Sequence, residues 1–200
     1  MTVEADVERP WRCFLAVPIP ESLRASLADA VAAVRSDPRV EAEWRFADPG
    51  GWHVTLAFLG ATPVLSVGLL VDRVADAVGE LAPFEVSTGG LGGFPSRRHA
   101  RVLWYGVSDP DRRLRELARV VQAAGGLEDG APFRPHITMA RARDRRGADA
   151  AELMSAEVPA GSVAIQGMTL FRSHLGRGPA HYEVLAEVPL GTALRVGASR

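Results

Sequence analysis

The sequence predicts a mixed fold of strands and helices in two related halves, because one order of elements occurs twice along 200 residues. The first copy runs from an apolar strand beginning at Arg12, through a helix over 21–35, to an alternating strand that begins at His53. The second copy runs from strand-like segments over 84–107, through a helix, to a strand that begins at His136. Such a repeat indicates a duplicated chain whose halves are related by a pseudo-twofold axis.

Each element of the first half has a local physical reason. The apolar segment "RCFLAVPIP" is stopped by prolines, as expected of a buried strand that leaves into a turn. The helix over 21–35 carries an apolar stripe at helical spacing, formed by Leu23, Leu27, Val31 and Val34. Proline and glycine in "FADPGG" mark the turn before the histidine strand, and the segment over 64–82 returns to a helical period.

The second half contains a similar set of signals. Two strand-like segments surround a connection rich in glycine and arginine. Asp109 is typical of a helix cap, with Pro110 at the first helical position and a Gly-Gly pair at 125–126 ending the helix. Two later segments are interpreted as closing strands, at 162–173 and 181–190.

The composition excludes several classes of function. All 23 basic residues are arginine, so Schiff-base chemistry, a Walker-type phosphate loop and lysine-nucleotide intermediates are excluded. The formal net charge of -1 argues against broad coating of nucleic acid. Cys13 is the only cysteine, which excludes an intrachain disulfide and a cysteine-rich zinc site. With an acidic N-terminus and no apolar run of membrane-spanning length, we expect a cytoplasmic protein with no membrane partner.

The two histidine strands carry the strongest chemical signal. Because residues i and i+2 of a strand share a face, His53 projects with Thr55, and His136 projects with Thr138. A pseudo-twofold axis would bring both pairs into one cleft. Two imidazoles with ordinary pKa values of about 6.5 can serve as general base and general acid, while hydroxyls donate to anionic oxygens. The set suits a phosphoryl group attacked on one side while its leaving oxygen is protonated on the other.

Other interpretations compete with this one. A lone His-x-Thr is more often structural than catalytic, but two copies at the starts of two apolar strands favour a function. Neither motif histidine has a second His, Asp or Glu at a short ligand interval, and threonine is a poor zinc ligand, so we expect no metal and no cofactor. The loop over 97–101, with three arginines and His99, is either a solvated turn or a contact for a phosphate backbone. By strand alternation, the side chain of Arg141 points to the other face of the sheet from that of His136. It therefore needs a bulge or a strand end to reach the cleft.

The paired motifs "HVTL" and "HITM" resemble those of the two-histidine phosphoesterases, and more narrowly the RNA 2',3'-cyclic phosphodiesterase family, historically called 2'-5' RNA ligases. The blocks "RCFLAVPIP", "GGFPSRRHARVLWYGV" and "FRSHLGRGPAHYEVL" are similar to that family's blocks in the same order. The resemblance implies a bilobal α+β fold in which two antiparallel sheets flank a central cleft, with helices on the outside. We expect one domain over 1–200, with lobes of about 12–81 and 84–190 that can exchange strands.

By position, the resemblance implies that His53 donates a proton to the leaving oxygen and that His136 accepts a proton from water. It implies that Thr55, Thr138 and Arg141 bind the phosphate. The implied activity is metal-independent hydrolysis of terminal 2',3'-cyclic phosphates to 2'-phosphates. The resemblance leaves open a reversible 2'-5' RNA ligation, in which a 5'-hydroxyl replaces water.

We expect a monomer that takes RNA ends or cyclic nucleotides as substrate. One alternative is a binding module for RNA ends or nucleotides that does not catalyse, because a fold does not guarantee activity. A second alternative is a phosphodiesterase for another small cyclic phosphate. Activity on RNA ends, compared with activity on cyclic mononucleotides, separates these hypotheses.

Overall fold

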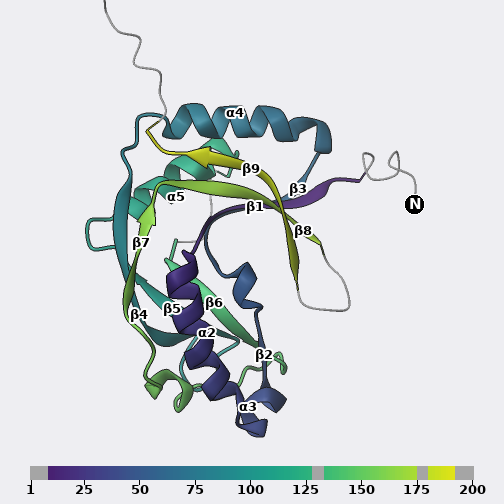
Figure 1. The fold of residues 1–200 in the computed structure, drawn as a ribbon. Coiled ribbons are helices and arrows are strands. Elements are labelled where there is room, and N and C mark those ends of the chain that lie inside the picture. The colour runs from purple at the N-terminus through teal and green to yellow at the C-terminus, as the bar shows by residue number, and fades with distance from the viewer. Residues whose placement is uncertain (1–8, 128–132, 175–179, 192–200) are drawn as a thin grey trace, which may run out of the picture.

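The computed structural model describes residues 9–127, 133–174 and 180–191, which contain both strands and helices (Figure 1). The strands are β1 (Trp11–Pro18), β2 (Trp44–Phe46), β3 (His53–Thr62), β4 (Phe84–Phe94), β5 (Val102–Ser108), β6 (His136–Ala142), β7 (Gly161–Ile165), β8 (Gly167–His174) and β9 (His181–Pro189). The α-helices are α2 (Glu21–Arg35), α3 (Pro38–Glu43), α4 (Val67–Val78) and α5 (Arg113–Ala124). Short 3-10 turns are η1 (Pro49–Gly51), η2 (Val64–Ser66) and η3 (Leu153–Ser155).

The strands form one strongly curled sheet in the order β7-β4-β5-β6-β3-β1-β8-β9, with β2 paired to β6 as well (Figure 1). The α+β prediction is confirmed. The expectation of two separate sheets is corrected, because β3 and β6 pair with each other, with Val54 opposite Ile137. Both side chains are fully buried. Pairing the two inner strands satisfies backbone groups that two separate sheets would leave at open edges.

The sheet order places strands from distant parts of the sequence side by side. β8 and β9 follow the second histidine strand in the chain, yet β8 pairs with β1, where Phe171 lies opposite Phe14. β7 pairs with β4 at the other end of the sheet. The two outer strands of the sheet, β7 at one edge and β9 at the other, therefore both come from the last third of the described chain.

Two helices cross between the halves. Helix α2 follows β1, but its Leu23 packs over Gly161 of β7 in the other half of the sheet. Helix α5 follows β5, but it packs against β3, where Leu59 contacts Gly125 at the helix end. Figure 1 shows α4 and α5 together beside β9, away from α2. The crossing helices tie the two halves into a continuous buried core.

The predicted helix ends agree with the structure for α2 but not for the start of α5. Helix α2 begins and ends at the predicted residues. In α5 the N-cap residue is Arg112 and not Asp109, although the Asp109 carboxylate accepts from the backbone N–H groups of Leu114 and Arg115, each at 3.0 Å. The predicted start at Pro110 is wrong. Arg112 has a left-handed backbone with φ of 58°, so the helix begins only after it.

The described helices also bear on membrane association. None of them is both long and apolar enough to cross a bilayer. The amphipathic faces of α2, α4 and α5 instead bury a few apolar side chains each against the sheet.

Candidate active site

A cavity of about 470 Å³ lies over the join between β3 and β6 and is bounded by β1, β2 and the β8–β9 hairpin. Four of the five predicted site residues line it, namely His53, Thr55, Thr138 and Arg141. His136 is not among the lining residues, although it stands on the same strand face as Thr138. The structure thus brings the two motifs to one place.

The register of the join arranges the two His-Thr pairs. Val54 lies opposite Ile137 in the antiparallel ladder, so His53 is the cross-strand neighbour of Thr138, and Thr55 is the neighbour of His136. Val54 and Ile137 point into the core, and alternate residues point to the other face. Each histidine therefore has a hydroxyl from its own strand and a hydroxyl from the partner strand within its surroundings.

Both histidines are held by the same kind of hydrogen bond. Nδ1 of His53 lies 2.6 Å from the carbonyl oxygen of Gly51, and Nδ1 of His136 lies 2.6 Å from the carbonyl oxygen of Arg134. A carbonyl oxygen only accepts, so each Nδ1 carries a proton and donates it. Nε2 is then left as the atom that gives or takes a proton, in both halves of the site.

A bulge in β6 brings Arg141 to the cavity. The pairing with β5 places Leu103 opposite Ala140 and Trp104 opposite Thr138, so Met139 is the extra residue. One extra residue changes the face to which every later side chain points. Regular strand alternation would turn Arg141 away from the cleft, but the bulge turns it back, so Arg141 lines the same cavity as Thr138.

The first histidine strand has a bulge at the matching position. The pairing with β1 places Leu15 opposite Ala57 and Ala16 opposite Thr55, so Leu56 is the extra residue. Phe58, five residues after His53, therefore reaches the cavity just as Arg141 does five residues after His136. Its side chain is 69% exposed, which is unusual for a phenylalanine beside a core. The sequence analysis missed Phe58, although this equal offset was a usable signal.

Each bulge also has an outside donor for its carbonyl group. The backbone N–H of Ala47 donates to the Met139 oxygen at 2.8 Å. The side-chain Nε2 of Gln122, from α5, donates to the Leu56 oxygen, also at 2.8 Å. A bulged residue loses its regular ladder partner, so these donors stabilise the distortion in both strands.

Burial controls the protonation of both histidines. Burial lowers the pKa of His53 to about 4, against the raising effect of its bond to Gly51, and the charge of His136 adds a smaller lowering. Burial also lowers the pKa of His136, opposed by its bond to Arg134 and reinforced by the charge of Arg141. Both imidazoles are therefore neutral in the free protein at pH 7. A bound anion would raise both pKa values, because it stabilises the imidazolium form.

Aromatic side chains cause the burial of His53. Its ring centroid lies 4.9 Å from that of Phe14 and 5.3 Å from that of Tyr182, which meets it edge-on. His136 has an aromatic neighbour as well, since the ring of Phe94 meets it edge-on at 5.2 Å. Sequence reasoning missed Tyr182 and Phe94, because they reach the histidines from strands that no local motif connects to them.

Arginines dominate the charged lining of the cavity. Arg12, Arg45 and Arg141 line it together with one carboxylate, Asp48, which accepts from the backbone N–H of Gly50 at 2.7 Å. The loop over 97–101 contributes no residue to this lining. Within the described ranges, no three His, Cys, Asp or Glu side chains gather into a group that could hold a metal ion.

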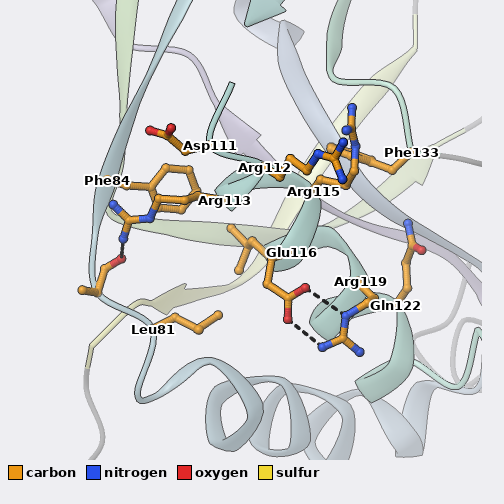
Figure 2. A pocket seen from close by; sticks show the side chains of 12 residues that line it. Leu81, Phe84, Asp111, Arg112, Arg113, Arg115, Glu116, Arg119, Gln122 and Phe133 are labelled. Atoms are coloured by element: carbon orange, nitrogen blue, oxygen red, sulfur yellow. Dashed lines mark hydrogen bonds and ion pairs between the residues drawn. The ribbon is translucent and has the colours of Figure 1, made fainter. Parts of the chain in front are cut away.

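A second cavity, of about 640 Å³, lies along α5 and contains none of the predicted site residues (Figure 2). Some of its polar groups are already paired. Glu116 forms an ion pair with Arg119, while Arg113 donates to the carbonyl oxygen of Ala82 and lies 4.6 Å from the ring of Phe84. No histidine is among the described residues that line it. The cavity at the β3–β6 join is therefore the candidate active site.

Comparisons with known proteins agree with this geometry. Residues 19–177 match the family described as the 2'-5' RNA ligase superfamily. A Methanothermobacter thermautotrophicus protein named RNA 2',3'-cyclic phosphodiesterase is 31% identical over 172 residues, covering 82% of this chain and 90% of that relative. A Geobacillus stearothermophilus protein of the same name is 31% identical over 183 residues, covering 88% of this chain and 56% of that longer relative.

A solved structure extends the comparison to the fold. Escherichia coli LigT complexed with 3'-AMP has a TM-score of 0.70 and 25% identity, covering 90% of this chain and 98% of LigT. The family match spans most of the chain, and the resemblance inferred from the paired motifs is confirmed. The chain therefore belongs to the 2'-5' RNA ligase superfamily.

Proposed function

We propose that this protein is an RNA 2',3'-cyclic phosphodiesterase, which opens a terminal ribose 2',3'-cyclic phosphate to a 2'-phosphate. The observation that carries the proposal is the meeting of two His-Thr pairs across Val54 and Ile137, at a cavity lined by arginines. The names of the two relatives described above support the same activity. In LigT, the bound 3'-AMP supports a nucleotide as substrate.

The reaction follows from the two free Nε2 atoms. His136 takes a proton from a water molecule, whose oxygen forms a new bond to phosphorus. The bond from phosphorus to the 3'-oxygen breaks, and His53 gives its proton to that oxygen, which leaves a 2'-phosphate. Thr55 and Thr138 donate to the non-bridging oxygens, and Arg141 balances their charge. For ligation, a 5'-hydroxyl takes the place of water.

His53 has to gain a proton before it can act as the acid, and substrate binding favours this. An acid must start protonated, but the low pKa of His53 keeps it neutral in the free protein at pH 7. The cyclic phosphate is an anion, so its binding beside the imidazole raises that pKa. In this mechanism the substrate therefore prepares the acid, while the lowered pKa of His136 already suits a base.

The remaining parts of the proposal concern cell context and assembly. We place the protein in the cytoplasm, in accord with a single, free and buried cysteine. We propose that it works as a monomer and needs no metal or cofactor, because the two imidazoles supply both proton transfers. The chain is taken as one domain over 1–200 with lobes of about 12–81 and 84–190.

A direct assay tests the proposal. Purified protein is given an oligoribonucleotide ending in a 2',3'-cyclic phosphate, in the presence of excess chelator, and the terminal phosphate is followed by phosphorus NMR. We expect conversion to a 2'-phosphate at a rate that the chelator does not change. An intact cyclic phosphate after long incubation would contradict the substrate assignment, and activity only without chelator would contradict the metal-independent mechanism.

A second substrate class has some support from the size of the site. A cavity of about 470 Å³ falls within the range of small-molecule pockets, so a cyclic mononucleotide is the main competing substrate. A module that binds RNA ends without turnover would instead show tight binding, unchanged when His53 is replaced by alanine, and no product. Running RNA ends and cyclic mononucleotides in one assay separates these cases.

A further inference from the structure

Two arginines face each other across a strand pair at the wall of the cavity. In the pairing of β2 with β6, Arg45 lies directly opposite Arg141, and both residues line the cavity. Directly opposed residues of an antiparallel pair have Cβ atoms about 4.5–5.5 Å apart, and like charges at that spacing destabilise a sheet. An anion between them would turn this repulsion into attraction.

The described surroundings offer these two side chains no acidic partner. No ion pair joins Arg45 or Arg141 to a carboxylate in the described ranges, although surface arginines elsewhere do pair, as Arg39 does with Asp37. The one carboxylate of the cavity lining, Asp48, already accepts from Gly50. The guanidinium donors of the pair are thus available to a ligand.

The position of the pair along β6 shows which part of a ligand it would meet. Ile137 marks the centre of the His-Thr arrangement, and Arg141 lies three ladder steps beyond it because Met139 is bulged, or about 10 Å of strand at 3.3 Å per step. Long arginine side chains reach back over part of this distance. Arg141 can therefore touch the reacting phosphate, while Arg45, on the neighbouring strand, extends the positive surface beyond it.

We propose that Arg45, which extends the positive surface beyond Arg141, binds the phosphodiester that precedes the terminal cyclic phosphate. The inference rests on the proposed function and narrows its substrate class. A cyclic mononucleotide lacks this upstream phosphate, whereas an oligoribonucleotide of two or more residues has it. The subsite makes Arg45 a specificity residue that selects RNA ends over free cyclic nucleotides.

Three substrates and four proteins test this subsite. The substrates are a nucleoside 2',3'-cyclic phosphate, a diribonucleotide ending in that group, and the same diribonucleotide with an uncharged methylphosphonate at the upstream linkage. The proteins are wild type, Arg45→Gln, Arg45→Lys, and Arg73→Gln as a matched loss of one positive charge on α4, outside the cavity. The quantity compared is kcat/KM, with thermal melting to confirm that each variant folds.

The expected result for wild type is a kcat/KM about 10- to 100-fold higher for the charged diribonucleotide than for the methylphosphonate, as for one hydrogen bond to a charged group. Arg45→Gln should bring this ratio close to one, Arg45→Lys should keep part of it, and Arg73→Gln should keep all of it. Equal rates on the charged and uncharged diribonucleotides by wild type would overturn the subsite, as would an unchanged ratio in Arg45→Gln. Failure of wild type to open any of the three substrates would instead overturn the proposed function, and the subsite with it.

Discussion

Val54 and Ile137 lie opposite one another where β3 meets β6, and both side chains are fully buried beneath the two histidines. This one register sets the whole candidate site. It places His53 beside Thr138 on the cavity face, and a slip of one residue would turn one of the two pairs into the core. The apolar pair thus links the stability of the join directly to the geometry of the proposed catalysis.

Removing either imidazole should abolish most of the activity without unfolding the protein. For His53→Ala and His136→Ala we expect kcat to fall by about 10²- to 10⁴-fold, which is the usual contribution of a positioned acid or base. The double variant should lose little more, because the two residues act as a unit. Steady-state kinetics on a cyclic-phosphate end, with thermal melting as the control, checks this. Near wild-type turnover in either single variant would refute the two-histidine mechanism.

The pH profile of kcat/KM should peak on the acid side of neutrality. This parameter reports the pKa values of the free protein, and burial lowers both histidines below their ordinary value of 6.5. Two histidines with ordinary pKa values would give a maximum of kcat/KM near neutral pH. Because burial lowers both pKa values, we expect the maximum at a lower pH. The maximum of kcat should lie at higher pH, because the bound anion raises both pKa values. Coincident maxima at or above pH 7 would contradict this account.

Stability should fall on mild acidification because of His53. Its pKa is about 4 in the folded protein and 6.5 when unfolded, so the unfolded chain binds more protons between these values. The free energy of unfolding is therefore highest above pH 6.5. It falls as the pH drops toward 4, by at most about 3 kcal/mol. Chemical denaturation across this range should show the slope in wild type and a smaller slope in His53→Gln. Equal slopes would exclude His53 as the source.

Gln122 should support the bulge that turns Phe58 toward the cavity. Its Nε2 donates to the carbonyl oxygen of Leu56, so Gln122→Met keeps the shape but leaves that oxygen without its donor. We expect a loss of about 1–2 kcal/mol in unfolding free energy and a higher KM with a smaller change in kcat. Gln122→Glu cannot donate when ionised and serves as a second test. An unchanged KM in both variants would show that the bulge holds without this bond.

Sequence periodicity predicted the parts of the site that depend on local geometry. The two His-Thr pairs follow from strand alternation alone, and α2 was placed to the residue from its apolar stripe. For Arg141, strand alternation alone predicted the wrong face, and only the family resemblance implied a place at the phosphate, because the direction of its side chain depends on the bulge at Met139.

The distant contacts of the site were also beyond the sequence. The low pKa of His53 depends on Phe14 and Tyr182, which lie on β1 and β9, strands that no pattern joins to it. The start of α5 was missed because Arg112 takes a left-handed backbone that its residue type does not favour. The fusion of two expected sheets into one likewise depends on the contact of Val54 with Ile137, a pairing between residues 83 positions apart.

The assignment of acid and base is tested most directly by changing the leaving group. A ribose 2'-phosphodiester analogue whose leaving group needs no proton should be cleaved by His53→Ala at a rate close to wild type, while His136→Ala should stay inactive on it. The measurement is the ratio of kcat on the activated analogue to kcat on the cyclic-phosphate end for each variant. Rescue of His136→Ala instead would reverse the two roles, and rescue of neither would contradict proton donation by His53.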